Sequence, residues 1–182
     1  IQWLRDKLKI IKNSKQTENI SKKNKSNGGV YFVPAFTGLG APHWYPDVRG
    51  IITGLTRNSD SNDIVRAALE SVVYQSIDLI NAMKYDGFRP SLIKIDGGMT
   101  ENNWFNQFLS NLSNLKILRP QNLETTALGA ALTAGYGAGI FKSFLEIAKK
   151  NRVNRQYKPK ITNKDRLKLL NGWHQAIRKT IK

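Results

Sequence analysis

The amino-acid sequence predicts an α/β fold in which helices pack on a mixed β-sheet, and three features support this class. Two short segments rich in β-branched and aromatic residues, 29–36 and 50–55, come early in the chain. Strand-like and helix-like patterns then alternate up to residue 141, and the double glycine Gly97-Gly98 ends one of these strands. Early strands followed by such alternation are typical of a mixed sheet covered by helices. Ligands of such folds bind beyond the carboxyl ends of strands.

The first sixty residues predict one helix end, one linker and one pair of strands. Apolar residues at helical spacing in 1–12 indicate the end of a helix. Residues 13–29 are rich in Lys, Ser and Asn and show no apolar period, so we expect a surface linker there. Segments 29–36 and 50–55 are expected to pair as antiparallel strands around the loop 37–47.

A long helix is predicted from Asn62 to about Lys84. Asn62 is the expected N-cap, and Asp63 adds a negative charge to the first turn. The expected buried stripe consists of Ile64, Ala68, Leu69, Val72, Ser76, Ile80 and Met83.

Beyond this helix the predicted elements alternate. They are a strand at 92–96, a helix at 102–114, a short strand at 115–118 and a helix at 125–141 that is rich in Ala and Gly. The small residues would let that last helix pack closely on a sheet or on another helix. Residues 144–182 predict two further basic helical segments, separated by residues 155–159.

The candidate binding segment is the strand, glycine turn and helix of residues 92–114. Glycines without Cβ atoms allow a ligand to approach the backbone, and a helix N-terminus offers free N–H groups to a phosphate. A tight connection between strand and helix explains an isolated Asp-Gly-Gly more often than a binding role does. For Asp96, ordering a phosphate or Mg²⁺ region and capping its own turn are equally acceptable roles.

The formal charge of +16 is concentrated at the two ends of the chain. Residues 1–26 hold eight Lys/Arg and two acids, and residues 142–182 hold thirteen and two, whereas residues 27–141 hold eight and nine. Aromatic residues are not interleaved with the basic runs, as a single-strand stacking surface requires. This distribution favours a solvated surface over a nucleic-acid groove.

Several site classes are excluded or disfavoured by composition. The chain has no cysteine, which removes disulfides, thiolate nucleophiles and Cys-based metal sites. It has two histidines, far apart in sequence, and no run of eighteen apolar residues that could span a membrane. The absence of cysteines and of a targeting pattern favours the cytoplasm. Because the chain begins with Ile1 inside a helical pattern, we expect it to be part of a longer protein.

Four linked motifs resemble the FGGY carbohydrate kinases, and among these the kinases that act on glycerol. They are residues 33–44 (VPAFTGLGAPHW), residues 50–55 followed after seven residues by 63–70, Asp96-Gly97-Gly98 with Asn102, and residues 126–131 (TALGAA). An ordered set across nearly the whole chain is far more specific than one glycine pair. The resemblance implies the C-terminal lobe of a two-lobed kinase with the actin-like, ribonuclease-H-like ATPase fold.

The resemblance also implies nucleotide-binding roles, residue by residue. Gln2 matches a position that contacts the nucleotide, Gly98 beside Gly97 matches a glycine whose backbone lies against it, and Asn102 matches an asparagine beside the adenine and ribose. The residue types suit these roles, since both amides can donate and accept hydrogen bonds. The alternatives are a surface helix residue for Gln2 and a simple helix cap for Asn102.

The implied reaction transfers the γ-phosphate of MgATP to glycerol, giving sn-glycerol 3-phosphate and ADP. The implied cofactors are ATP/ADP and Mg²⁺. In the family, the aspartate that accepts the hydroxyl proton, the glycerol-binding residues and the phosphate loop precede the part that this chain matches. The chain alone is therefore expected to contain no catalytic residue and to be inactive.

Three segments are expected. Residues 1–28 are a helix end and linker that continue from a preceding lobe, 29–141 form the nucleotide-binding core, and 142–182 are a basic helical extension packed on the same domain. Family members often form dimers or tetramers, so self-association is a further expectation. Two alternatives stay open, namely another FGGY kinase for a pentulose or other polyol, and a non-catalytic basic domain that binds nucleotide or nucleic acid.

Overall fold

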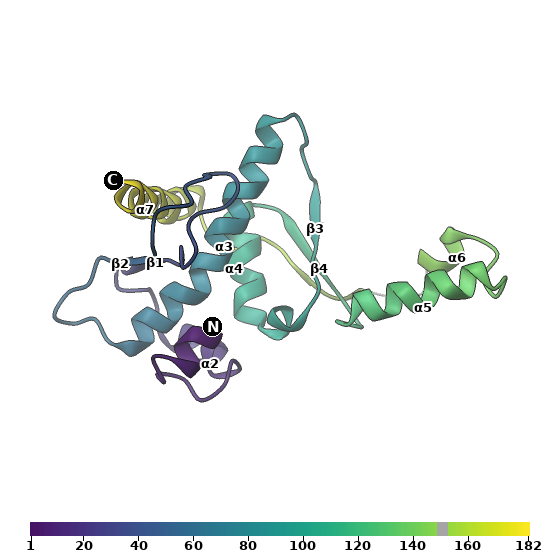
Figure 1. Ribbon diagram of the computed structural model, residues 1–182, viewed down its shortest axis with the longest axis horizontal. Helices are drawn as coiled ribbons and strands as arrows, with labels where there is room; N and C mark the ends of the chain where they lie inside the picture. Colours follow the sequence, from purple (N-terminus) through teal and green to yellow (C-terminus); the bar gives the residue numbers. More distant parts are fainter. Residues whose placement is uncertain (149–152) are drawn as a thin grey trace.

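The computed structural model describes residues 1–148 and 153–182 and has a mixed α/β architecture (Figure 1). Its elements are α1 (Gln2–Asp6), α2 (Gln16–Lys23), β1 (Tyr31–Val33), β2 (Ile51–Thr53), α3 (Ser61–Tyr85), β3 (Leu92–Lys94), the 3-10 helix η1 (Gly98–Glu101), α4 (Asn103–Ser113), β4 (Lys116–Pro120), α5 (Thr125–Gly137), α6 (Phe144–Ala148), β5 (Val153–Tyr157) and α7 (Asn163–Ile181). The long helix α3 runs through the centre, between α7 with the β1–β2 pair and α4 with the other strands.

The strands form two small sheets. β1 and β2 pair antiparallel with Tyr31 opposite Thr53, which confirms the predicted strand pair. β3 and β4 are parallel, with Ile93 opposite Ile117, and β4 and β5 are antiparallel, with Ile117 opposite Tyr157. The second sheet is therefore mixed, in the order β3-β4-β5, as the predicted fold class requires.

Besides the single turn η1, two regular elements were missed by the sequence prediction. Helix α2 lies within the expected linker 13–29, and strand β5 lies where residues 155–159 were expected only to separate two helices. The buried residues of α2 are the polar Thr17 and Ser21, and in β5 only Tyr157 is buried. Neither segment shows the apolar periodicity on which the prediction depended.

Helix α3 begins at a different cap from the predicted one. Oδ1 of Asp60 accepts hydrogen bonds from the backbone N–H groups of Asn62 at 2.8 Å and Asp63 at 3.1 Å. Oδ2 of Asp63 in turn accepts one from the backbone N–H of Asp60 at 3.2 Å. This reciprocal capping box satisfies donors that the first helical turn leaves free, so Asp60 rather than Asn62 is the N-cap.

The buried face of α3 also differs from the predicted stripe. Its buried residues are Val65, Arg66, Ala67, Ala68, Leu69, Glu70, Ser71, Val73, Tyr74, Ile77 and Asp78. Of the predicted set, Ala68 and Leu69 are buried, whereas Met83 is 45% exposed. The prediction was correct in part, because Ile64, Val72 and Ile80 also pack half-buried against the core. It missed the buried Arg66, Glu70 and Asp78, since a hydrophobic pattern assigns charged residues to solvent.

Aromatic side chains of α3, α4 and α7 meet in the main core. The ring of Tyr74 lies parallel to that of Trp173 at 5.2 Å and edge-on to that of Phe108 at 5.8 Å. The indole N–H of Trp173 donates to Oδ2 of the buried Asp78 at 2.7 Å. Helix α7 is thus held on α3 by apolar burial and by one hydrogen bond to a charged group.

Helices α5 and α6 extend away from the rest of the molecule (Figure 1). The small residues of α5, which were expected to pack closely, are mostly exposed, and Gly135 is its one buried residue. An added Cβ at Gly135 would meet the ring of Phe141 at 2.8 Å, so this glycine lets the chain fold back after α5. The helix ends at Gly137, earlier than the predicted residue 141.

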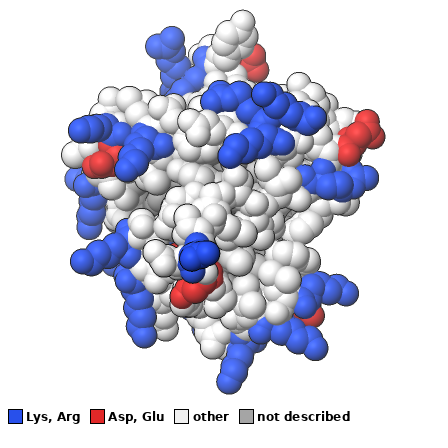
Figure 2. All heavy atoms as spheres, turned by 90° about the vertical axis from the view of Figure 1, so that its left-hand side faces the viewer, with Lys and Arg blue, Asp and Glu red and all other residues white. Residues whose placement is uncertain are grey.

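The surface of the molecule is basic, as the formal charge of +16 indicates. On the face drawn in Figure 2, Lys and Arg outnumber Asp and Glu and are spread around the rim, while the centre carries few charges. Among the described residues, no helix is both long and apolar enough to cross a bilayer.

Candidate functional site

A cavity of about 490 Å³ lies beside α2 and η1, at the end of the turn that follows β3. Its lining residues are Ile1, Ser14, Lys15, Thr17, Glu18, Asn19, Leu69, Gly98, Met99, Glu101 and Asn102. The volume is in the range of small-molecule sites, which combine apolar walls with a few polar groups. Ile1, Leu69 and Met99 supply the apolar part here, and the remaining side chains and backbone supply the polar part.

The two glycines of the turn have different roles. Gly97 has a φ of +83°, which favours glycine, and its backbone N–H donates to the carbonyl of Leu123 at 3.2 Å. Gly98 begins η1 and lines the cavity, whereas Gly97 does not. A Cβ added to Gly98 would meet no protein atom within 4 Å, so the space in front of this backbone is open.

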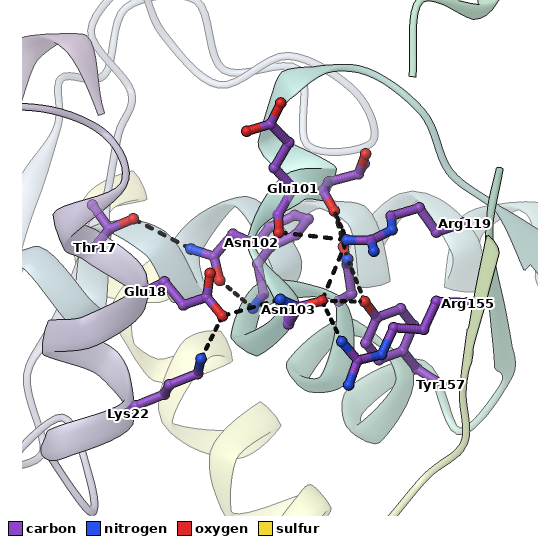
Figure 3. Close-up of polar contacts among 12 residues, drawn as sticks. Thr17, Glu18, Lys22, Glu101, Asn102, Asn103, Arg119, Arg155 and Tyr157 are labelled. Atoms are coloured by element: carbon purple, nitrogen blue, oxygen red, sulfur yellow. Dashed lines mark hydrogen bonds and ion pairs between the residues drawn. The ribbon is translucent and has the colours of Figure 1, made fainter. Parts of the chain in front are cut away.

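Asn102 joins the turn to α2 and also caps α4 (Figure 3). Its Oδ1 accepts a hydrogen bond from the backbone N–H of Phe105 at 2.9 Å, and its Nδ2 donates to the hydroxyl of Thr17 at 3.3 Å. Asn102 is therefore a helix cap, which was the alternative to a binding role in the sequence analysis. Asn102 lines the cavity as well, so one side chain caps the helix and forms part of the cavity wall.

Gln2 is not brought to the same cavity. It is exposed at the start of α1, and its neighbour Ile1 lines the cavity instead. A nucleotide contact by Gln2 stays a prediction.

Several residues of the cavity wall lie in the missed helix α2 and in the turn before it. Thr17 and Glu18 line the cavity from α2, and Ser14 and Lys15 line it from the turn. The one signal for a helix in this segment was the i,i+4 pair of Glu18 and Lys22, whose charged atoms lie 2.6 Å apart. Such a pair indicates a helix only weakly, and nothing in it indicates a cavity.

Glu18 is held as a carboxylate by its neighbours. Its partial burial would raise its pKa, but hydrogen bonds from Lys22 and from Asn103, whose Nδ2 lies at 3.3 Å, outweigh this effect and lower the pKa. An ionised acid therefore stands at the edge of the cavity. It is already paired, which distinguishes it from a free general base.

The candidate acid Asp96 and the buried Glu70 lie outside the cavity. Oε1 of Glu70 accepts from Nε of Arg66 at 2.7 Å and Oε2 accepts from Nδ2 of Asn27 at 2.9 Å, so Glu70 is a buried structural acid. Asp96 accepts a hydrogen bond from the hydroxyl of Thr125 and lines a separate hollow. Within residues 1–148 and 153–182, no group of three or more His, Asp or Glu side chains is placed to hold a metal ion.

Residues 1–138 match the C-terminal domain of the FGGY family of carbohydrate kinases. The chain belongs to this family. The match includes the glycine turn, the N-cap Asn102 and α2, and therefore every element that lines the cavity.

Relatives in this family are similar over the entire chain. A glycerol kinase of Gluconobacter oxydans is 50% identical over 182 residues, which is all of this chain and 36% of that protein. A glycerol kinase of Rhodospirillum centenum is 48% identical over 99% of the chain and again 36% of the relative. The chain thus spans about a third of the length of the relatives that it matches.

Solved structures of FGGY kinases have the same fold. The glycerol kinase of Plasmodium falciparum, crystallised with ADP, superposes with a TM-score of 0.90 at 35% identity, over 100% of this chain and 36% of that one. A xylulose kinase of Lactobacillus acidophilus superposes with a TM-score of 0.77 at 20% identity, over 97% of this chain and 36% of that one, and shows the fold alone. The chain has the actin-like ATPase fold of the FGGY C-terminal domain, as the resemblance implied.

Proposed function

We propose that this chain is the nucleotide-binding part of a kinase that transfers the γ-phosphate of ATP to glycerol. The observation that carries the proposal is that Gly98 and Asn102, which match nucleotide-contacting positions of the family, line one cavity together with α2. The relative from Gluconobacter oxydans, 50% identical over the whole chain, bears the name glycerol kinase. The superposed kinase of Plasmodium falciparum carries ADP.

The chemistry of the cavity suits an adenosine group with its phosphates. Apolar contacts from Ile1, Leu69 and Met99 can cover a flat base, and the open backbone at Gly98 admits the ligand without a side chain in the way. Polar groups of α2 and of Asn102 remain beside the base and sugar. Mg²⁺, which neutralises the transferred phosphate in such reactions, belongs to the proposed full active site.

The catalytic base and the glycerol-binding groups are proposed to lie in the part of the protein that precedes the matched region. The acids nearest the cavity in this chain are Glu18, which is paired with Lys22, and Glu101, which is exposed. Neither is assigned a catalytic role. The chain would supply nucleotide affinity and one wall of a site that closes between two lobes.

The test uses the full-length protein and the variant Gly98→Val. An added side chain at this position meets open space, so the variant should fold while its side chain enters the nucleotide cavity. We expect the KM for ATP to rise about tenfold or more, with the KM for glycerol changed by less than about twofold. The matched control is Gly40→Val, another exposed glycine with no atom within 4 Å of an added Cβ and outside the cavity, which should leave both constants unchanged.

Substrate class is tested in the same assay. Because xylulose kinases share the fold at 20% identity, a pentulose is the second candidate substrate. Phosphorylation of D-xylulose in preference to glycerol would reassign the substrate and leave the nucleotide site intact. An unchanged KM for ATP in a folded Gly98→Val protein would reject the nucleotide site itself.

A further inference from the structure

A second hollow, of about 530 Å³, is lined in part by Asn103, the residue that follows Asn102 of the cavity wall. We call it the basic hollow, and its lining residues are Lys22, Asn103, Trp104, Gln107, Arg155, Gln156, Tyr157, Lys158 and Lys160. Four of these nine residues are cations, and none is an acid. A concave surface lined by one sign of charge concentrates ions of the opposite sign.

In the part of the chain that the structure describes, three of the four cations form no ion pair. Lys22 pairs with Glu18 at 2.6 Å. Among the described residues, no carboxylate forms an ion pair with Arg155, Lys158 or Lys160. Cations gathered without carboxylates repel one another, and a bound anion would remove this repulsion.

The side chain of Arg155 is held in place by its neighbours. NH1 of Arg155 donates to Oδ1 of Asn103 at 2.9 Å, and its guanidinium lies 5.4 Å from the ring centre of Tyr157. The hydroxyl of the buried Tyr157 donates to the same Asn103 oxygen at 2.8 Å, as Figure 3 shows. NH1 of Arg119 reaches this oxygen from the other side at 3.3 Å. The guanidinium of Arg155 is therefore positioned before any ligand arrives.

The two lysines are also anchored. The carbonyl of Lys158 accepts a hydrogen bond from Nε2 of Gln107 at 2.8 Å. The backbone N–H of Lys160 donates to Oδ1 of Asn111 at 2.9 Å. Gln107 and Asn111 belong to α4, which also lines the hollow. The segment between β5 and α7 is therefore hydrogen-bonded to this helix.

We propose that the basic hollow binds a small, multiply charged oxyanion of the kind that phosphorylated metabolites carry. The forked donors of Arg155 match the oxygen geometry of a phosphate, and the ammonium groups of Lys158 and Lys160 add flexible point charges. Three unneutralised cations match a ligand with more than one negative charge. The hollow shares no lining residue with the nucleotide cavity, so the two sites are separate.

The experiment is a calorimetric titration of the full-length protein with inorganic pyrophosphate. We expect saturable binding that weakens about tenfold in Lys158→Ala/Lys160→Ala. The matched control is Lys164→Ala/Lys168→Ala, which removes two exposed lysines of α7 and the same net charge outside the hollow, and should change the Kd by less than about twofold. Arg155→Lys, which keeps the charge and loses the fork, should also weaken binding.

Four outcomes would overturn the proposal. They are no binding of pyrophosphate, equal losses in the two double-lysine variants, a loss confined to Gly98→Val, and preference for duplex DNA with a steep salt dependence. Equal losses would indicate general charge attraction, and a loss in Gly98→Val alone would place the anion in the nucleotide cavity. The DNA result would indicate a nucleic-acid surface. Thermal unfolding of each variant checks that the losses do not come from misfolding.

Discussion

The side-chain amide of Asn102 donates a hydrogen bond to the hydroxyl of Thr17 at 3.3 Å, across 85 residues of sequence. Thr17 is buried in α2, and Asn102 is the N-cap of α4. This contact joins two walls of the cavity beside α2 and η1, so the position of α2 and the shape of the cavity depend on each other.

Replacement of Thr17 by Val should remove this hydrogen bond between α2 and Asn102. The variant keeps the side-chain shape and removes the hydrogen bonds of Oγ1 with Asn102 and with the carbonyl of Ser14, which lies at 2.7 Å. We expect the free energy of unfolding to fall by about 1 to 2 kcal/mol, and the affinity of the full-length protein for ADP to fall several-fold. Thr126→Val, at an exposed position of α5, is the control. Lost stability with unchanged ADP affinity would show that α2 does not shape the nucleotide site.

The loop 37–47 should depend on His43. Nε2 of His43 lies 2.9 Å from Oδ2 of the buried Asp78. Among the residues that the structure describes, no second polar side chain of the loop makes such a bond to the core. We expect His43→Ala to accelerate proteolytic cleavage within the loop and to lower the free energy of unfolding by about 1 to 2 kcal/mol. His174→Ala is the control, because Nε2 of His174 is 3.8 Å from Oδ1 of Asp78. Equal cleavage rates in the two variants would contradict an anchoring role.

The buried Glu70 should give stability a specific pH dependence. Burial raises the pKa of its carboxyl, and the hydrogen bonds from Arg66 and Asn27 offset this only in part. The folded state then keeps the proton to higher pH than the unfolded chain does. The contribution of Glu70 to stability is therefore complete below the pKa that its carboxyl has in the unfolded chain. It is lost as the pH rises through the higher pKa that the carboxyl has in the folded protein.

Urea unfolding of the protein and of Glu70→Gln over a series of pH values tests this dependence. We expect the free energy of unfolding of the unchanged protein, minus that of the variant, to decrease as pH rises from the ordinary carboxyl pKa of 4.5. An increase over that range would mean that the Arg66 pair, rather than burial, decides the ionisation of Glu70.

Gly54 should tolerate no side chain. Its φ is +84°, and a Cβ there would collide with the carbonyl oxygen of Gly29. We expect Gly54→Ala to lower the free energy of unfolding by about 2 kcal/mol or more, because both backbone strain and the clash act on the end of β2. Gly40→Ala, where an added Cβ meets nothing within 4 Å, should have little effect in the same thermal or urea unfolding measurement. Similar losses at both positions would contradict the clash.

Part of the candidate site could be predicted from the sequence because its signals are local. The glycine turn after β3 and the N-cap Asn102 each depend on a few adjacent residues, and both lie where the sequence placed them. The short helix η1 between them was missed, because a single 3-10 turn has no apolar period. The α2 side of the cavity was also missed, since Thr17 becomes buried only through contact with residues far away in the chain.

The sequence by itself determined the α/β class, the antiparallel pairing of β1 with β2, and membership of the FGGY family through its ordered motifs. Only the tertiary structure decided which charged residues of α3 are buried and that β5 completes the second sheet. It also decided which residues line the cavity and which line the basic hollow. The physical reason is that Arg66, Glu70 and Asp78 are buried through hydrogen bonds with partners that other elements supply. Such partners are far apart in sequence and leave no local pattern.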